Sequence, residues 1–501
     1  MPKQHTVLIR ADANSVIGAG HVSRCLALAQ EIQDRGDHWI FAAAELGALK
    51  TRIAAEGLDV VEIPAKPGSL EDAEFTAGLY RDFKASWLVA DGYCFGEVFQ
   101  SALRAAKIRT LLLDDYGQLG VWHSQLVLDQ NVDARKEHYS NVAPGTLLLL
   151  GSRYVLLRRE FRKYRVWQRN IKGTARNLLV TFGGGDRSAM FNKVISALKL
   201  MPHNFFDAVL VVGPNAFDPN ALNNSAADSG LQIRIETNAT DMAALMSWAD
   251  LAISAAGSTC WETCYLGLPA LVFHVTSNQL KTAQSLHDAG AIRHLGGTND
   301  AAPEVIASEL MKLAKDSTER ERMSQVGRKL IDVRGAERVA DILLQPAIQL
   351  RPVVESDCRI LWQWANDSEV RRQSFAQEVI SWPAHQQWFQ SQLADSETLI
   401  RIAEDERKDS IGVVRFKLTG TGAVVSISLA PEFRGRGLAS SVLKCALEEL
   451  LRTTSVREVS AFVKPENLAS LRLFQGAGFI CKEHTSVDGE ATMHLVLQNS
   501  A

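Results

Sequence analysis

The chain contains 501 residues, of which 46% are hydrophobic and 22% charged, and its formal net charge is −3. At roughly 150 residues per domain, this length predicts about three domains. The composition is close to the globular average, which excludes collagen-like, low-complexity and disordered classes. The small net charge gives no electrostatic reason to expect nucleic acid or an anionic membrane as a partner.

The sequence gives no sign of export or membrane insertion. The apolar run at residues 7–9 is too short for a signal peptide, and no run of about 18 uncharged apolar residues follows it. The seven cysteines are widely spaced and include no C-x-x-C pair, which suits a reduced cytoplasm without a zinc site. We therefore expect a cytoplasmic protein without a bound metal.

Short apolar runs typical of buried strands recur along the first part of the chain. A helical pattern follows the first run, with Val22, Leu26 and Ala29 on one face and Gly36 at its end. Acids follow two of the runs, at Asp91 and at 114–115, and open α/β sheets bind ligands at the carboxyl ends of their parallel strands. We predict a doubly wound lobe over 1–165, with strands at 6–11, 39–43, 87–90, 110–113, 126–128 and 147–150.

A basic segment, 158–172, divides this lobe from a second one. It contains seven Arg or Lys side chains, a pattern that favours a solvated connecting helix. Strand–helix alternation then restarts, which predicts a second doubly wound lobe over 166–346. Two such lobes in tandem are typical of an enzyme whose site lies in the cleft between them. The strands expected in the second lobe are 178–182, 208–212, 251–254 and 270–275.

The pattern changes near residue 345. The runs at 399–403, 411–417 and 424–429 have no long helices between them, which predicts an antiparallel meander. Helical segments follow at 439–451 and 468–476. We therefore predict an α+β domain over 347–501.

The first candidate site is the segment 18–21, Gly-Ala-Gly-His, between a strand and a helix. Glycines let a ligand approach the backbone, and the amides at a helix N-terminus favour anions. His21 would lie at the mouth of the cleft, where an imidazole can act as a general base near neutral pH. The alternative is a histidine that only caps the helix.

Two further segments in the second lobe have the composition of nucleotide-binding turns. Residues 183–185 are three glycines whose amides can cradle a phosphate, although a flexible turn explains them equally well. In the segment 254–262, Glu262 can accept hydrogen bonds from a ribose diol. However, Thr259 and Glu262 also have the spacing of a capping box, so Glu262 can instead serve the helix. Asn278 and Gln279 follow the next strand and are placed to meet the same ligand.

The strongest signal is the turn at 429–439, which joins a strand to a helix. Its spacing Arg434-x-x-Gly437-x-Ala439 presents consecutive amides and a helix dipole to a pyrophosphate. Residues 424–479 resemble the GNAT acetyltransferases through this turn and through Asn467 with Gly478-Phe479. The resemblance implies acetyl-CoA as co-substrate, bound by Leu429, Arg434, Gly435, Arg436, Gly437, Leu438, Ala439 and Asn467.

Two details refine the GNAT resemblance. The segments 364–372 and 385–389 are similar to the acceptor-side helices of the branch that acetylates 4-amino UDP-sugars. Phe474 stands where many GNAT enzymes carry a tyrosine general acid, so the departing thiolate has to be protonated in another way, for example by water.

Residues 1–345 resemble the GT-B nucleotide-sugar enzymes, in particular the UDP-sugar hydrolases of pseudaminic acid biosynthesis. The similar segments are 10–12, 17–24, 91–93, 151–158 and 183–186, together with Ser258, Glu262 and 278–279. The resemblance implies hydrolysis of UDP-2,4-diacetamido-2,4,6-trideoxy-β-L-altropyranose without a metal, with His21 as the base that activates water. It also implies sugar contacts by Tyr93 and Asn278, a ribose contact by Glu262, and phosphate contacts by Gly257 and Ser258. The complete set of substrate-binding candidates is Arg10, Asp12, Gly20, Tyr93, Gly184, Gly257, Ser258, Glu262, Asn278 and Gln279.

Together these resemblances imply an α/β protein with two GT-B-like, Rossmann-type lobes followed by an α+β GNAT domain. The C-terminal domain would acetylate the 4-amino group of a UDP-sugar, and the N-terminal lobes would then remove UDP. We expect small-molecule partners only, a nucleotide sugar and acetyl-CoA, with no more than weak self-association. The alternative is a UDP-sugar glycosyltransferase joined to a non-catalytic domain that senses acetyl-CoA.

Overall fold

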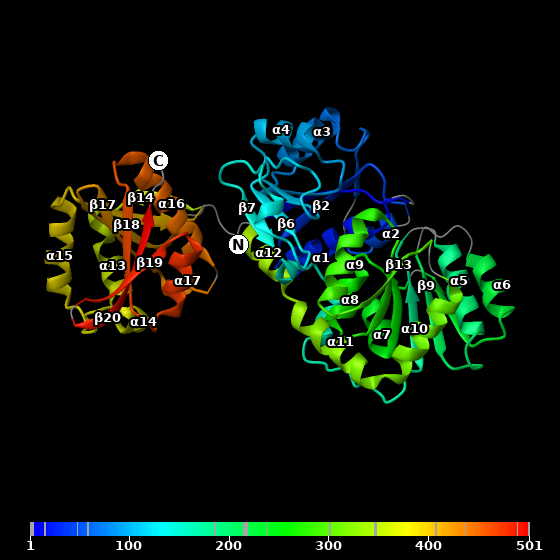
Figure 1. Cartoon of the computed structure of the whole chain (residues 1–501). Helices are drawn as coiled ribbons and strands as arrows, with labels where there is room; N and C mark the ends of the chain where they lie inside the picture. Colours follow the sequence, from blue (N-terminus) through cyan, green and yellow to red (C-terminus); the bar gives the residue numbers. More distant parts are fainter. Residues whose placement is uncertain are drawn as a thin grey trace. The chain divides into compact units, whose positions relative to one another are not determined.

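The computed structural model describes residues 5–14, 17–47, 49–57, 60–184, 187–213, 219–237, 239–299, 302–344, 348–405, 408–435, 437–487 and 489–498. These residues form two compact units, Met1–Leu343 and Leu344–Ala501, which we describe separately (Figure 1). Three residues of the predicted binding turns, Gly185, Asp186 and Arg436, lie outside the described residues.

The first sheet of the N-terminal unit has seven parallel strands in the order β3-β2-β1-β4-β5-β6-β7. Every residue of its central strands β1, β4 and β5 except Thr6 is buried, as expected for a parallel sheet covered by helices on both faces. The strands are β1 (Thr6–Ala11), β2 (His38–Ala43), β3 (Val60–Glu62), β4 (Trp87–Asp91), β5 (Thr110–Leu113), β6 (Leu126–Asp129) and β7 (Leu147–Leu150). The helices are α1 (Gly20–Asp34), α2 (Leu49–Ala54), α3 (Leu70–Asp82) and α4 (Glu97–Ala105).

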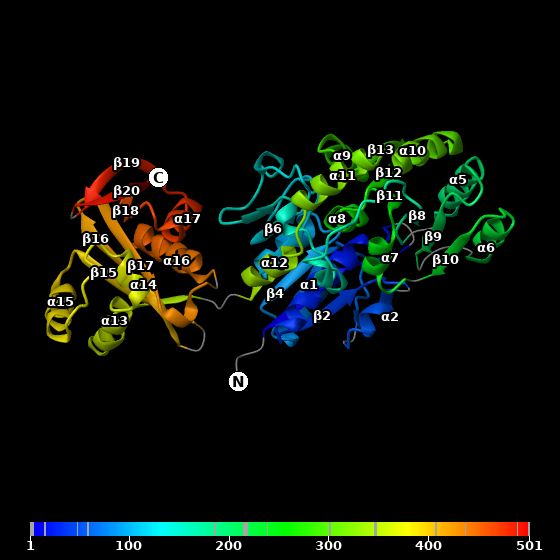
Figure 2. The same cartoon turned by 90° about the horizontal axis from the view of Figure 1, so that it is seen from below.

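The second sheet is also parallel and has the order β10-β9-β8-β11-β12-β13. Helices lie along both of its faces (Figures 1 and 2). Its strands are β8 (Asn177–Thr181), β9 (Asp207–Val212), β10 (Ile233–Thr237), β11 (Leu251–Ala255), β12 (Ala270–His274) and β13 (Arg293–Gly297). The helices are α5 (Ser188–Lys199), α6 (Pro219–Ala227), α7 (Met242–Trp248), α8 (Thr259–Tyr265), α9 (Ser277–Asp288), α10 (Pro303–Lys315), α11 (Ser317–Leu330) and α12 (Gly335–Leu343).

The last helix of this unit, α12, returns to the first lobe. Arg35, at the end of α1, donates a hydrogen bond to Asp341 at 2.8 Å. Gly335 begins α12 so close to the backbone of Val155 that a Cβ there would lie 2.0 Å from the Val155 carbonyl oxygen. The N-terminal unit is therefore tied together by a helix that follows the second lobe in the sequence and packs on the first.

The predicted helix over 158–172 is wrong. Only Arg159–Tyr164 is helical, as a short 3-10 helix, and the rest of this segment is turn and irregular structure. Most of the basic side chains have protein partners, because the segment crosses between the lobes and finds partners in each, although Lys163, Arg165 and Lys172 are exposed. Arg162 pairs with Asp34 of α1, whereas Arg169 donates to the carbonyl groups of Met246, Ala249 and Leu266.

The C-terminal unit contains one sheet in the order β14-β15-β16-β17-β18-β20-β19. The predicted meander is confirmed as β15, β16 and β17, which pair antiparallel. The strands are β14 (Gln349–Pro352), β15 (Thr398–Glu404), β16 (Ser410–Thr419), β17 (Gly422–Leu429), β18 (Glu458–Val463), β19 (Ile480–Val487) and β20 (Glu490–Gln498). The helices are α13 (Cys358–Ala365), α14 (Ser368–Gln373), α15 (Trp382–Ala394), α16 (Leu438–Thr453) and α17 (Leu468–Gly476).

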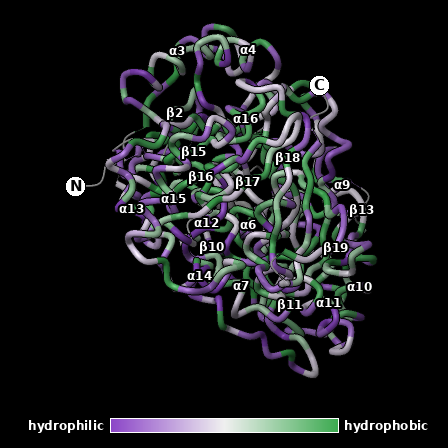
Figure 3. Tube along the Cα trace, turned by 90° about the vertical axis from the view of Figure 1, so that its left-hand side faces the viewer, coloured by the Kyte–Doolittle hydropathy of each residue, from purple (hydrophilic) through white to green (hydrophobic). Residues whose placement is uncertain are grey.

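The two faces of this sheet are covered by different helices. Val414 and Phe416 of β16 belong to the larger core, which includes Val442 of α16. Val413, on the opposite face of the strand, packs with the smaller core that contains Trp364 of α13 and Phe389 of α15. In Figure 3 hydrophobic and hydrophilic residues, green and purple, are mixed along the trace around β15, β16 and β17. Among the described residues, no helix is long and apolar enough to cross a membrane.

Candidate functional site

His21 lies in the first turn of α1 and is bound to Asp91, the last residue of β4. Its Nδ1 atom lies 2.6 Å from Asp91 Oδ1, and both side chains are buried. Asp91 is ionised, because although burial raises its pKa, the charge of Arg24 and the hydrogen bonds from Arg24 and His21 hold that pKa well below its usual range. An ionised carboxylate can only accept, so Nδ1 donates a proton to this bond, and Nε2 is the ring nitrogen that does not bind Asp91. His21 does not cap α1, since no side chain bonds at the N-cap, Ala19.

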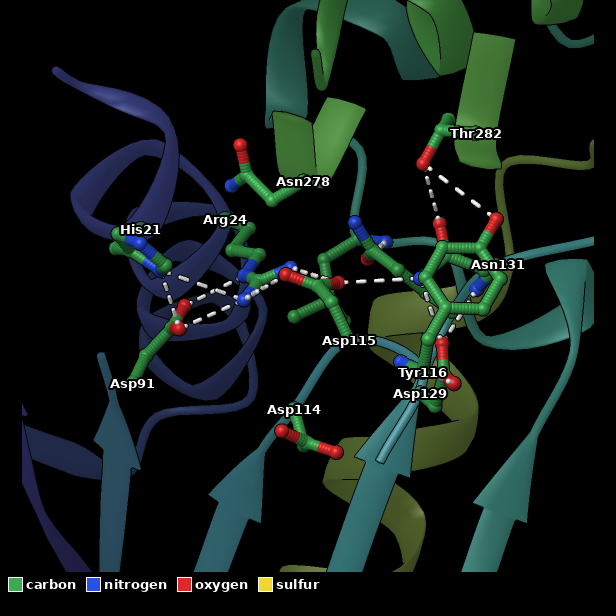
Figure 4. A network of polar contacts seen from close by, with 12 residues as sticks. His21, Arg24, Asp91, Asp114, Asp115, Tyr116, Asp129, Asn131, Asn278 and Thr282 are labelled. Atoms are coloured by element: carbon green, nitrogen blue, oxygen red, sulfur yellow. Dashed lines mark hydrogen bonds and ion pairs between the residues drawn. The ribbon is translucent and has the colours of Figure 1, made fainter. Parts of the chain in front are cut away.

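Arg24, one turn further along α1, joins two carboxylates. Its Nε and Nη2 atoms donate to Asp91 at 2.6 and 2.7 Å, and its Nη1 donates to Asp115 at 3.1 Å. Figure 4 shows His21, Arg24 and Asp91 pointing toward one another, with Asp115 beyond the guanidinium. We call these four residues the His21 centre. The bidentate contact fixes the Asp91 carboxylate and hence the orientation of the His21 ring.

Helix α9 of the second lobe reaches this centre through two residues four positions apart. Asn278 donates to the Tyr93 hydroxyl at 2.9 Å, and that hydroxyl donates to Asp115 at 2.9 Å. Thr282 donates to Asn131 at 3.2 Å, and the Asn131 amide also donates to Asp115. Both routes end on Asp115, so the second lobe is connected to the His21 centre by hydrogen bonds. The His21 ring itself lies edge-on to Tyr93, with ring centroids 4.8 Å apart.

A second group of acids lies next to the centre, at the ends of β5 and β6. Burial, together with repulsion from Asp115 and Asp129, raises the pKa of Asp114 to about 6. Asp129 accepts hydrogen bonds from the Tyr139 hydroxyl and from Asn131, which hold it in place. No cluster of three or more His, Cys, Asp or Glu side chains in the described part of the chain has a metal-binding arrangement.

Asp114→Asn should raise the melting temperature more at pH 8 than at pH 5. The ordinary pKa of an aspartate is about 3.9, so a folded-state pKa of about 6 means that stability falls as pH rises between these values. An amide keeps an oxygen for the Gly117 N–H, which Asp114 now accepts at 2.9 Å, and removes the charge. Thermal melts at both pH values test this, with exposed Asp82→Asn as the control. An equal shift at both pH values would contradict it.

Arg10 and Asp12, predicted to bind substrate, are buried at the end of β1. Arg10 pairs with Asp12 at 2.7 Å and with Asp72 at 3.0 Å. Asp12 also accepts the backbone N–H of Ala44 at 2.7 Å. All these partners are protein groups, which gives the two residues a positioning role for the loop after β1. Direct contact with a substrate stays a prediction.

Gly20 and Gly184 lie where the two lobes approach one another. Gly184 packs so closely on Ala19 that a Cβ at position 184 would lie 2.7 Å from the Ala19 side chain. Gly20 follows Ala19 directly, and a Cβ there would meet open space. Gly257 lies beside Gln279, whose amide nitrogen would be 3.8 Å from a Cβ at 257. Ser258 is the N-cap of α8 and makes no capping bond with its side chain.

Glu262 does not form the capping box that its spacing with Thr259 allowed, because Thr259 is the first residue of α8 rather than its N-cap. Glu262 instead accepts a hydrogen bond from Arg158 at 2.7 Å. Arg158 is buried and pairs with Glu160 as well, at 2.9 Å. The helix-capping alternative is therefore wrong, and Glu262 is held by the segment that joins the lobes.

In the C-terminal unit the sheet divides between β17 and β18. These two strands pair only over Gly422–Val424 and Glu458–Ser460, although each continues further. A cavity of about 940 Å³ opens here, bounded by the unpaired parts of both strands and by α13, α14 and α15. The predicted acceptor-side residues Trp364, His385 and Trp388 all line it.

The predicted acetyl-CoA residues border the same cavity. Leu429, Arg434, Gly435, Ala439 and Asn467 line it. Gly435 and Gly437 have φ values of +74° and +75°, a conformation that leaves backbone amides exposed and that other residues rarely adopt. A Cβ at 435 would meet open space, so the turn has room for a bound group. Leu438 begins α16, is buried, and packs into the core instead.

Asn467 at the start of α17 and Phe474 within this helix also line the cavity. Asn467 is the N-cap of this helix, and its side chain accepts the backbone N–H of Ser470 at 3.0 Å. Phe474 lines the cavity and packs on Phe479, with ring centroids 5.1 Å apart. The position of the usual acid is thus apolar and has no exchangeable proton.

Comparison with known proteins agrees with the division of the chain into an N-terminal and a C-terminal unit. Residues 177–339 match the model of the glycosyltransferase family 28 C-terminal domain, and residues 348–480 match that of the acetyltransferase (GNAT) domain. The structure of MurG from Acinetobacter baumannii superposes with a TM-score of 0.50 and 20% identity, over 68% of this chain and 99% of MurG. The N-terminal unit is GT-B-like, and the C-terminal unit is GNAT-like. The predicted fold class is thereby confirmed, and the GNAT match supports acetyl-CoA as the co-substrate.

Two curated relatives align over most of their length. The spore coat polysaccharide biosynthesis protein SpsG of Bacillus subtilis is 26% identical and covers 67% of this chain and 96% of its own. An uncharacterized protein of Methanocaldococcus jannaschii is 23% identical and covers 94% of this chain and 96% of its own, so the alignment spans both units.

Sequence reasoning placed His21, Tyr93 and Asn278 in one site, and the structure brings them together. The sequence alone assigned no role to Arg24, Asp115 or Asn131, which the structure places in the same site. The available signals were the one-turn spacing of His21 and Arg24 on a helix and the acids that follow β4 and β5.

Proposed function

We propose that the two units carry out consecutive reactions on one UDP-sugar. The GNAT-like unit acetylates the 4-amino group of the precursor, and the GT-B-like unit then hydrolyses UDP-2,4-diacetamido-2,4,6-trideoxy-β-L-altropyranose. This assignment places the chain in pseudaminic acid biosynthesis. It rests on the sequence resemblances, and the SpsG relative, named for polysaccharide biosynthesis, supports a role in making surface sugars.

The observation that carries the hydrolase proposal is the hydrogen bond from His21 to buried Asp91. Because Nδ1 is committed to the carboxylate, Nε2 is the atom that can take a proton from water. The resulting hydroxide equivalent attacks the anomeric carbon from the face opposite UDP. The bond between that carbon and the phosphate oxygen breaks, UDP leaves with the electron pair, and the configuration inverts. Asp91 then stabilises the imidazolium.

The remaining residues of the GT-B-like unit would hold the substrate. Tyr93 and Asn278 contact each other beside His21 and would bind the sugar. Gly257 and Ser258, at the start of α8, would bind phosphate, with Gln279 beside them. Glu262 would accept from the ribose diol. Gly20 and Gly184, on either side of the contact between the lobes, would let the backbone approach the nucleotide, while Arg10 and Asp12 support the loop after β1.

The GNAT-like unit would hold acetyl-CoA at the turn 434–439 and along the divided strands. The co-substrate supplies an acetyl thioester, and the unprotonated 4-amino group of the sugar attacks its carbonyl carbon. The C–S bond breaks, CoA leaves as the thiolate, and the nitrogen gives up one proton to water. The left-handed glycines and the N-terminus of α16 present amides to the pyrophosphate. Since Phe474 has no acidic proton, water that enters the cavity would protonate the thiolate.

A second candidate is a UDP-sugar glycosyltransferase, which the match to the family 28 model favours. Hydrolysis and transfer differ in the nucleophile alone. Incubation of the full chain with the diacetamido UDP-sugar, followed by NMR of the products, separates them. The proposal requires UDP and a free sugar that first appears as the inverted anomer, whereas an intact substrate in the absence of an added acceptor would overturn it.

Glu262→Ala should weaken UDP binding by roughly 1.5–3 kcal/mol, the range for a lost charge-assisted hydrogen bond. Glu160→Ala is the matched control, because it removes the other carboxylate of Arg158 and leaves Glu262 in place. Calorimetric titration with UDP and a melting curve should be recorded for both variants. If both variants lose the same affinity, Glu262 acts only through Arg158.

A further inference from the structure

Arg415, near the middle of β16, faces the acceptor side of the GNAT-like unit. Side chains alternate along a strand, so Arg415 shares a face with Val413, which packs against α13 and α15. Its neighbours Val414 and Phe416 belong to the opposite face, against α16. The turn predicted to bind acetyl-CoA leads into α16. Arg415 therefore lies on the sheet face away from that helix, while it still lines the 940 Å³ cavity.

Three other Arg and Lys side chains among the described residues line this cavity, and each has a protein partner. Arg371 donates to the carbonyl groups of Ala365 and Ala376. Arg434 pairs with Asp367 at 2.6 Å, and Lys464 lies 3.5 Å from Glu490. These contacts hold α14, the turn before α16, and β20 in place. None of the three cations is therefore free to serve as the main anion ligand in the cavity.

Arg415 has no such partner among the described residues. Its guanidinium lies 5.7 Å from the centre of the Trp388 ring, and no hydrogen bond or ion pair to a described residue accompanies that contact. Burial lowers its pKa, but an arginine remains charged at neutral pH. A partly desolvated cation without a counter-ion is unfavourable for folding. An anionic ligand in the cavity would supply the counter-ion that the Arg415 guanidinium lacks.

Trp388 provides an aromatic surface next to the position where an anion would bind Arg415. It lies on α15, lines the cavity, and leaves 36% of its surface exposed. An exposed indole beside a guanidinium offers a stacking surface next to a phosphate-binding fork.

We propose that Arg415 binds the diphosphate of the acceptor nucleotide-sugar, so that the GNAT-like unit selects an anionic acceptor over a free amino sugar or a polyamine. This inference rests on the proposed acetylation of a UDP-4-amino sugar. It adds the group that recognises the nucleotide and separates the anion site of the acceptor from the acetyl-CoA turn.

The test measures acetyl transfer by the full chain, read as release of the CoA thiol, which the hydrolase reaction does not produce. Arg415→Gln should raise the KM for the UDP-4-amino sugar about tenfold or more, in line with loss of a charged hydrogen bond. The dissociation constant of acetyl-CoA should stay unchanged, and Arg415→Lys should recover part of the KM. UDP should inhibit the wild type in competition with the acceptor and inhibit Arg415→Gln at least about tenfold less. Arg401→Gln is the matched control, because Arg401 lies on β15 of the same sheet and pairs with Glu449 of α16.

A 4-amino sugar without UDP completes the test, because the two variants of Arg415 should use it no worse than the wild type does. An unchanged KM for the UDP-sugar in Arg415→Gln, with an active wild type, would overturn the Arg415 inference alone. So would weaker acetyl-CoA binding with an unchanged acceptor KM. A wild type that acetylates spermidine and not the UDP-sugar would overturn the proposed function as well.

Discussion

His21→Ala should lower the turnover of UDP-sugar hydrolysis by at least about a hundredfold, the lower end of the range for general-base catalysis. The loss arises because Nε2 of His21 is the atom left free by the bond between Nδ1 and Asp91. UDP binding should persist, since the residues proposed to hold the nucleotide belong to the second lobe. Turnover is measured by UDP release from the diacetamido substrate, and binding by calorimetry.

The control for this prediction is His203→Ala, which removes an exposed histidine of the same unit. It should leave both turnover and UDP affinity unchanged. Near-normal turnover in His21→Ala would remove His21 from the role of base. A parallel loss of UDP affinity would instead mean that the variant disturbs the contact between the lobes.

Gly437→Trp should abolish acetyl-CoA binding and acetyl transfer while hydrolysis of the diacetamido substrate continues. Gly437 is the N-cap of α16 and has a φ of +75°, so a tryptophan there strains the turn and blocks the approach of a pyrophosphate. The hydrolase should survive because residues Met1–Leu343 form their own compact unit. Both activities are measured on the same preparation, and joint loss would contradict the independence of the units.

Gly420→Trp is the matched control for backbone strain. Gly420 also has a positive φ, +63°, but lies in the turn between β16 and β17, where a Cβ meets open space. It should retain acetyl transfer. If it loses as much activity as Gly437→Trp, the effect reports general strain in the sheet rather than a blocked pyrophosphate site.

The parts of the fold that the sequence predicts are those with local signals. The helix α1 ends just before Gly36, which adopts a φ of +83°, and the meander of the C-terminal unit is predicted from three apolar runs with no long helix between them. Local sequence signals did not predict the conformation of the segment 158–172. Its arginines find their partners far away in the sequence, such as Glu262, 104 positions after Arg158, and those contacts replace the helix that their composition suggests.

The same distinction holds for the candidate sites. The glycine-rich turns and His21 are visible as motifs, because their chemistry is local to a strand–helix junction. The pairing of His21 with Asp91 spans 70 positions, and Asp115 lies 91 positions from Arg24, so only the order of strands in the sheet brings them together. Arg415 has no motif at all, and its isolation from other charges is a property of packing alone.

The central claim is that acetylation precedes hydrolysis on one UDP-sugar. A site shaped for an acetamido group would leave polar groups unpaired around an amine and would have to desolvate an ammonium, both of which cost free energy. The decisive measurement is UDP release from the 4-amino UDP-sugar by the intact chain, with and without acetyl-CoA. The account predicts release that depends on acetyl-CoA and nearly none from Gly437→Trp, which should still cleave the diacetamido form. Equal rates with and without acetyl-CoA would contradict it.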